Sequence, residues 1–198
     1  MTTKEENNTK KRVFYDENNS VEKIGNCLRE LFLDDVVVLG IGTDRATGDT
    51  LGCLVGEFLD KRYKNIEVYG NLRDPIHAQN LHEYKDKFNK TIIAVDAALG
   101  KEESIGAIDV YDKPLKPGKG VGKDLIKLGD YYISGIVNVD NKNDLDNFEI
   151  IRSTRLCLIR DMAQVIAKGI VYGLEINNNV LNINNSDNAM NEKEKIYV

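Results

Sequence analysis

Two aspartates, Asp49 and Asp96, stand where the chain changes from one expected element to the next. Asp49 begins a helical pattern after an apolar run and a loop, whereas Asp96 directly follows the apolar run 91–95. Ligands of an open parallel sheet bind beyond the carboxyl ends of the strands, so neighbouring strands would bring both carboxylates to one crevice. Two close carboxylates repel, which keeps one protonated while the other is ionised. Such a pair can deprotonate a water and donate a proton, which is the chemistry of hydrolysis.

Each aspartate also has a structural interpretation. Asp49 suits the N-cap of the helix expected over 51–59, where its side chain would accept bonds from backbone amides. Capping and catalysis fit Asp49 about equally well, so both stay open. An acid that ends an apolar strand, as Asp96 is expected to do, is costly unless it is solvated, paired or functional. This cost favours a function for Asp96.

Four further polar residues are candidates for binding substrate near this crevice. Asp44 and Arg45 lie in the loop before Asp49, where the alternative is a simple ion pair. Asp74 and His77 form a candidate ligand pair, although an acid at a helix start and a hydrogen-bonded His are commoner. A metal held by Asp49, Asp74 and His77 is a weaker alternative, and we expect neither a metal nor another cofactor.

Apolar runs and helical patterns alternate along the middle of the chain. The order strand, helix, strand, helix, strand predicts a parallel sheet covered on both faces. We therefore expect an α/β fold, a three-layer sandwich with a mostly parallel central sheet flanked by helices. Strands are expected over 36–39, 66–69, 91–95, 105–111 and 132–139, and helices over 20–31, 51–59 and 76–88. A long last helix is expected to begin at a cap formed by Ser153 or Thr154, with Leu156 on its buried side.

The composition is that of one soluble globular domain. We predict a polar tail over 1–19, a single α/β domain over 20–175 and an Asn-rich mobile tail over 176–198. Within the first tail, residues 13–15 (Val-Phe-Tyr) are expected to dock as an extra strand or a staple. With neither a secretory signal nor a membrane-length apolar run, the protein is expected to be cytoplasmic. The net charge of -5 speaks against direct nucleic-acid binding.

Two glycine-rich segments fail as nucleotide motifs. The run after the first strand has Arg45 where a dinucleotide fingerprint needs Gly or Ala. The run 117–124 lacks both the first Gly and the Ser or Thr of a phosphate loop. Gly118, Lys119 and Gly120 are instead candidates for binding a substrate from a basic loop, with a solvated surface loop as the alternative.

Several ordered motifs resemble blocks of the YyaC family of sporulation proteins. The resemblance covers roughly residues 20–172. Its motifs are GIGTDRATGDTLG at 40–52, YGNLRDPIHA at 69–78, VDA at 95–97, PGKGVG at 117–122, GIVNV at 135–139 and TRL at 154–156.

That family is similar to the spore germination protease and, more distantly, to the hydrogenase maturation proteases. The resemblance implies a phosphorylase/hydrolase-like sheet with helices on both faces, and it nominates Asp49 and Asp96 as the catalytic pair. Gly48 and Cys53 depart from the pattern, because relatives carry Pro there. The maturation proteases bind nickel with two acids and a late His, whereas both histidines here lie mid-chain.

We therefore expect an aspartate-dependent endopeptidase of sporulation or germination, working in the cytoplasm of the forespore or the mother cell. Its expected partner is a protein or peptide substrate, with the small acid-soluble spore proteins as a candidate, and neither a membrane nor nucleic acid. A homo-oligomer is left open. The alternatives are a non-catalytic sporulation protein that binds a ligand in the same crevice, and a metal-dependent hydrolase similar to the maturation proteases.

Overall fold

The computed structural model describes residues 9–31, 33, 35–116 and 127–175. The expectations for Gly118, Lys119, Gly120 and the tail 176–198 lie outside these residues. The strands are β1 Thr9–Phe14, β2 Val36–Gly40, β3 Glu67–Tyr69, β4 Thr91–Gly100, β5 Ala107–Tyr111 and β6 Tyr131–Val139. The α-helices are α1 Ser20–Arg29, α2 Leu51–Arg62, α3 Asp144–Arg152 and α4 Leu156–Glu175, and the 3-10 turns are η1 Gly48–Thr50, η2 Leu81–Tyr84 and η3 Glu102–Ser104.

The six strands form one mixed sheet in the order β1-β5-β6-β4-β2-β3. Strands β3, β2, β4 and β6 run parallel to one another, whereas β5 runs antiparallel to both β6 and β1. The four parallel strands are rich in β-branched residues, as strands buried on both faces usually are. The predicted α/β sandwich with a mostly parallel sheet and helices on both faces is therefore confirmed.

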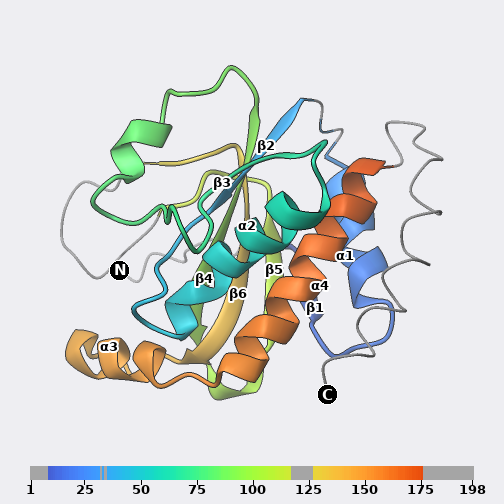
Figure 1. Cartoon of the computed structure of the whole chain (residues 1–198). Helices are drawn as coiled ribbons and strands as arrows, with labels where there is room; N and C mark the ends of the chain where they lie inside the picture. The colour runs from blue at the N-terminus through green and yellow to red at the C-terminus, as the bar shows by residue number, and fades with distance from the viewer. Residues whose placement is uncertain (1–8, 32, 34, 117–126, 176–198) are drawn as a thin grey trace, which may run out of the picture.

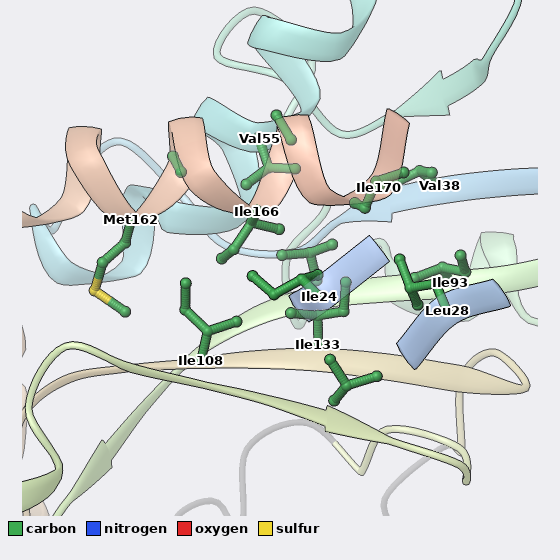
Figure 2. Close-up of a cluster of buried hydrophobic side chains, with 14 of the residues drawn as sticks. Ile24, Leu28, Val38, Val55, Ile93, Ile108, Ile133, Met162, Ile166 and Ile170 are labelled. Atoms are coloured by element: carbon green, nitrogen blue, oxygen red, sulfur yellow. The ribbon is translucent and has the colours of Figure 1, made fainter. Parts of the chain in front are cut away.

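Helices α1, α2 and α4 cover one face of the sheet (Figure 1). Apolar residues repeat along α4 at helical spacing, so one stripe of this long helix faces the strands. We call the cluster between these helices and the sheet the helix-side core. Figure 2 shows its side chains from α1, α2 and α4 meeting those of the strands, among them Ile24, Leu28, Val55, Ile93, Ile133, Met162 and Ile166.

A smaller cluster, the loop-side core, covers part of the opposite face. Its members come from β2, β4, η2 and the bridge between Leu115 and Leu128. The helix predicted over 76–88 is wrong, because only Leu81–Tyr84 forms a 3-10 turn. The side chain of Asn80 accepts from the amide of His77 and donates to the carbonyl of Pro75, and these bonds hold a turn in place of a helix.

The segment before α4 also differs from the prediction. Helix α3 was not expected, and α4 begins only at Leu156, which is 61% exposed rather than buried. The hydroxyls of Ser153 and Thr154 donate back to the carbonyl of Ile150 in α3 and do not cap α4. These two residues end one helix because their side chains bond to its last free carbonyl groups.

The extra strand expected at residues 13–15 is β1, which pairs with β5 at the edge of the sheet. Nε and Nη2 of Arg12 donate to the two carboxylate oxygens of Asp109 at 2.7 Å each, and the Asp109 side chain is completely buried.

Removing one partner of this ion pair should be costly. Arg12→Leu leaves the buried Asp109 carboxylate unpaired and is expected to lower the free energy of unfolding by about 2 kcal/mol. Adding Asp109→Leu should restore most of the loss, because an apolar pair no longer contains an uncompensated charge. Urea denaturation of the single and the double variant measures both effects. A single variant as stable as the wild type would contradict this role of Arg12.

Candidate active site

Asp49 and Asp96 meet where β2 ends beside β4. Strand β2 stops at Gly40, opposite Val95, and the next amide, that of Ile41, donates to the Val95 carbonyl at 2.8 Å. Asp96 therefore occupies the first position of β4 beyond the end of β2. The prediction that Asp96 ends its own strand is wrong, because pairing with β6 keeps β4 extended to Gly100.

The carboxyl ends of β2 and β4 form a topological switch point. From β2 the chain passes through α2 on the helix-side core and returns as β3 at one edge. From β3 it crosses the opposite face through η2 and returns as β4 on the other side of β2. The condition set in the sequence analysis, that the strands before Asp49 and Asp96 be neighbours, is met because β2 pairs with β4. Ligands of open α/β sheets bind at such a reversal.

Two glycines allow the Asp49 loop to approach the strand ends closely. Gly42 has φ +136°, and a Cβ atom there would lie 1.9 Å from the carbonyl oxygen of Asp49. A Cβ at Gly52 would lie 2.1 Å from the carbonyl oxygen of Ile41 and 2.6 Å from that of Val95. The start of α2 thus packs directly on the ends of β2 and β4, which brings Asp49 toward Asp96.

The two carboxyls have different electrostatic surroundings. Burial, and then the charge of Asp49, raises the pKa of Asp96 to about 8, although Asp96 Oδ1 accepts from the amide of Ala97 at 2.9 Å. Burial also raises the pKa of Asp49, but the backbone of Thr43 and the charge of His77 act in the opposite direction. Asp96 is thus the proton-holding member of the pair, and Asp49 is the more readily ionised member.

Asp49 is not the N-cap of the helix over 51–59 that the sequence analysis considered. It lies inside η1, whose N-cap is Thr47, while Thr50 is the N-cap of α2. Instead of capping, the Asp49 carboxyl is partly buried next to the His77 side chain. The local fold is held by other groups, such as the Thr50 hydroxyl, which donates to the carbonyl of Ala46.

A change of Asp96 should alter how stability depends on pH. The folded pKa near 8 lies above the ordinary value of 3.8. The folded chain therefore loses stability relative to the unfolded chain as pH rises from about 4 to about 8. Asp96→Asn removes this cost, so its stability relative to the wild type should increase by on the order of 4 kcal/mol from pH 5 to pH 9.

Urea denaturation at several pH values measures this difference. The exposed Asp86→Asn is the matched control and should follow the wild type. Parallel stability curves for the wild type and Asp96→Asn would show that Asp96 does not carry the raised pKa.

His77 and Cys53 are both coupled electrostatically to the aspartate pair. His77 lowers the pKa of Asp49, and the charges of Asp44, Asp49 and Asp96 all raise that of the Cys53 thiol. Burial is the larger cause, and the pKa of Cys53 reaches about 12. Cys53 is therefore a neutral thiol rather than a nucleophile at neutral pH.

Two further candidates from the sequence analysis lie on the surface. Arg45 and Asp74 are exposed. Asp74 is held in a turn with Asn71, whose side chain accepts from the Asp74 amide at 3.0 Å. Across the part of the chain that the structure describes, no three His, Cys, Asp or Glu side chains gather as a metal-binding group. The alternative metal site at Asp49, Asp74 and His77 is therefore not assembled.

The sequence analysis missed polar residues of β5 and β6 that share the face of Asp96. Ser134 is the register partner of Asp96 in β6, and Asp109 is the partner of Ser134 in β5. Tyr132 and Tyr111 form the next pair along the same two strands. The alternation of polar and apolar residues over 107–111 and 131–137 is the signal that could have revealed them.

A surface cavity at the other end of β4 does not belong to this site. Thr91, Lys90 and Tyr131 line it, at the amino end of the parallel strands. Ligands of such sheets bind at the carboxyl ends. Among the helices of the described residues, none has the length and apolar character needed to cross a membrane.

Comparison with known proteins identifies the family. Residues 12–169 match the family described as "Protein of unknown function (DUF1256)". The "Uncharacterized protein YyaC" of Bacillus subtilis (strain 168) is 44% identical over 156 residues, covering 74% of this chain and 73% of that protein. This chain belongs to the DUF1256 family. The resemblance to YyaC proteins is confirmed, and the DUF1256 match includes both aspartates.

Two solved structures are similar to this DUF1256 chain. The [NiFe] hydrogenase maturation protease HycI from Thermococcus kodakarensis KOD1 is 17% identical, with a TM-score of 0.45 over 72% of this chain and 97% of that one. An uncharacterized protein from Wolinella succinogenes is 13% identical, with a TM-score of 0.37 over 68% of this chain and 92% of that one. The fold class therefore rests on the sheet order and helix placement of this chain itself.

Proposed function

We propose that this protein is an aspartate-dependent endopeptidase of sporulation or germination, which hydrolyses peptide bonds with a water activated between Asp49 and Asp96. The observation that supports the proposal is the pairing of two unequal carboxyls at the switch point of the sheet. A pair of titratable groups with separated pKa values can work as base and acid at one pH.

In this mechanism the ionised Asp49 is the general base and the protonated Asp96 is the general acid. Asp49 takes a proton from the water as its oxygen attacks the carbonyl carbon, and Asp96 gives its proton to the carbonyl oxygen. The tetrahedral intermediate then breaks its C–N bond. The proton held by Asp49 passes to the leaving amine, and Asp96 recovers its own proton from the collapsing hydroxyl group.

The substrate of this proposal is an extended segment of a protein chain. In this proposal the peptide is oriented by the polar side chains of Asp44, Arg45 and His77, of which Asp44 and Arg45 are exposed. The resemblance to the spore germination protease makes the small acid-soluble spore proteins the first candidates. The proposed place of action is the cytoplasm of the forespore or the mother cell.

Purified protein incubated with extract from sporulating cells tests this function. Mass spectrometry of new peptide termini is expected to show discrete cleavage products with the wild type and none with Asp49→Asn or Asp96→Asn. The same products in all three samples would disprove the assignment. A ligand that saturates the protein without any product would favour the non-catalytic binding protein instead.

A further inference from the structure

A row of polar side chains crosses four strands on the face that carries Asp96. Its members are register partners: Asp96 in β4, Ser134 in β6, Asp109 in β5 and Arg12 in β1. Cross-strand partners point to the same face of a sheet. The apolar residues between them along the strands point into the helix-side core. The row therefore runs from Asp96 toward the edge of the sheet, with Ser134 and Asp109 buried.

Tyr132 and Tyr111 are register partners in the row next to the polar row. Their side chains extend toward the polar row. The Tyr111 hydroxyl donates to Asp109 Oδ2 at 3.2 Å, so the Tyr111 ring reaches from its own row to the polar row. The Tyr132 ring stacks on it, with centroids 4.2 Å apart and planes at 10°. The Tyr132 side chain is also hydrogen-bonded to that of Tyr111, so the two hydroxyls lie close together.

The surroundings of Tyr132 suit a hydrogen-bond donor. Burial, the neighbouring Tyr111 and the charges of Asp109 and Asp96 all raise the pKa of Tyr132, so its phenol keeps its proton. The ring is partly exposed, so a ligand can reach it. Tyr111 in turn is held by Asp109, which Arg12 fixes with two bonds. This series of contacts limits the positions that the Tyr132 ring can take.

We propose that the Tyr132 hydroxyl donates a hydrogen bond to the substrate carbonyl oxygen that reacts beside Asp96, and that Tyr111, Asp109 and Arg12 are its positioning residues. The inference rests on the proposed peptidase function. Negative charge develops on the carbonyl oxygen as water attacks, and a fixed donor stabilises that charge. A hydroxyl can rotate its proton from a protein partner to a ligand without moving the ring.

The first test follows Tyr132 without any substrate. In protein labelled with 13C at tyrosine Cζ, the Tyr132 signal is assigned by its loss in Tyr132→Phe. It is expected to shift with a midpoint near pH 8, as Asp96 titrates. This shift should disappear in Asp96→Asn. Tyr131, the preceding residue, packs on the helix-side core and is the matched control. Its signal should not shift with the titration of Asp96. A Tyr132 signal that ignores Asp96 overturns the inference.

The second test measures turnover of a peptide that the wild type cleaves in the extract experiment. Tyr132→Phe is expected to lower kcat about 10²-fold with KM nearly unchanged, because the lost bond forms mainly in the transition state. Tyr131→Phe should keep wild-type kcat. If Tyr132→Phe cleaves like the wild type while Asp96→Asn does not, only the inference about Tyr132 is overturned. A wild type that cleaves nothing overturns both the peptidase function and this role, whatever the Tyr132 signal does.

Discussion

Asp96→Asn is expected to lower kcat for peptide cleavage by about 10³-fold or more, because an amide cannot deliver the proton that the carbonyl oxygen needs. Asp49→Asn should cause a similar loss, because an amide cannot take the proton from the attacking water. The two residues act on one step, so the double variant should be hardly slower than either single variant. Steady-state kinetics on one defined peptide measure all three.

The pH dependence of the wild type gives this expectation a second readout. Activity should fall as pH rises through about 8, where Asp96 loses its proton. On the acid side, activity should fall as Asp49 becomes protonated. The midpoint of this fall should lie above 3.8, the ordinary pKa of an Asp carboxyl, because the pKa of Asp49 is raised. The exposed Asp86→Asn should preserve the whole profile. Full activity of Asp96→Asn at neutral pH, in correctly folded protein, would remove Asp96 from the mechanism.

Gly52→Ala is expected to lower the free energy of unfolding by about 4 kcal/mol or more, because the new methyl group has no space. Its Cβ would lie within 2.6 Å of backbone atoms of Ile41 and Val95, at the contact of α2 with β2 and β4. Helix propensity alone would favour Ala over Gly by about 1 kcal/mol, so the expected sign is set by the clash.

Gly100→Ala is the matched control, since its nearest neighbours are only side-chain atoms of Ile136, at 2.8 Å and beyond. That side chain can move, so the control should lose far less stability. Urea denaturation compares the two variants. Equal stability of Gly52→Ala and the wild type would contradict the close contact between α2 and the strand ends.

The sheet was predictable because its parallel strands carry continuous apolar runs such as residues 36–39. The candidates Asp49 and Asp96 were found from the same runs. Each follows the carboxyl end of an apolar run, and ligands of a parallel sheet bind at that edge. The full length of β4 could not be predicted, because residues 96–100 are extended through their pairing with β6 and their own sequence shows no strand pattern. The turn at 76–80 was missed because the side chain of Asn80 competes with helix formation.

The polar face of β5 and β6 was the least predictable part of the site. Asp109 and Tyr132 are distant in sequence, and their relation to Asp96 depends on the register of three strands. A local pattern contains no information about that register. The pairing of Arg12 with Asp109 depends further on β1 reaching the far edge of the sheet. Such contacts are products of topology, whereas the position of Asp96 directly after an apolar run can be seen in a single segment.

The most direct measurement of the proposed chemistry is cleavage by the wild type in water labelled with 18O, with EDTA present. Incubation with extract from sporulating cells, followed by mass spectrometry, is expected to yield new carboxyl termini that each carry one 18O atom. Chelation should not reduce their amount, because Asp49 and Asp96 activate the water without a metal. Absence of labelled termini, or their loss with EDTA, would contradict hydrolysis by this aspartate pair.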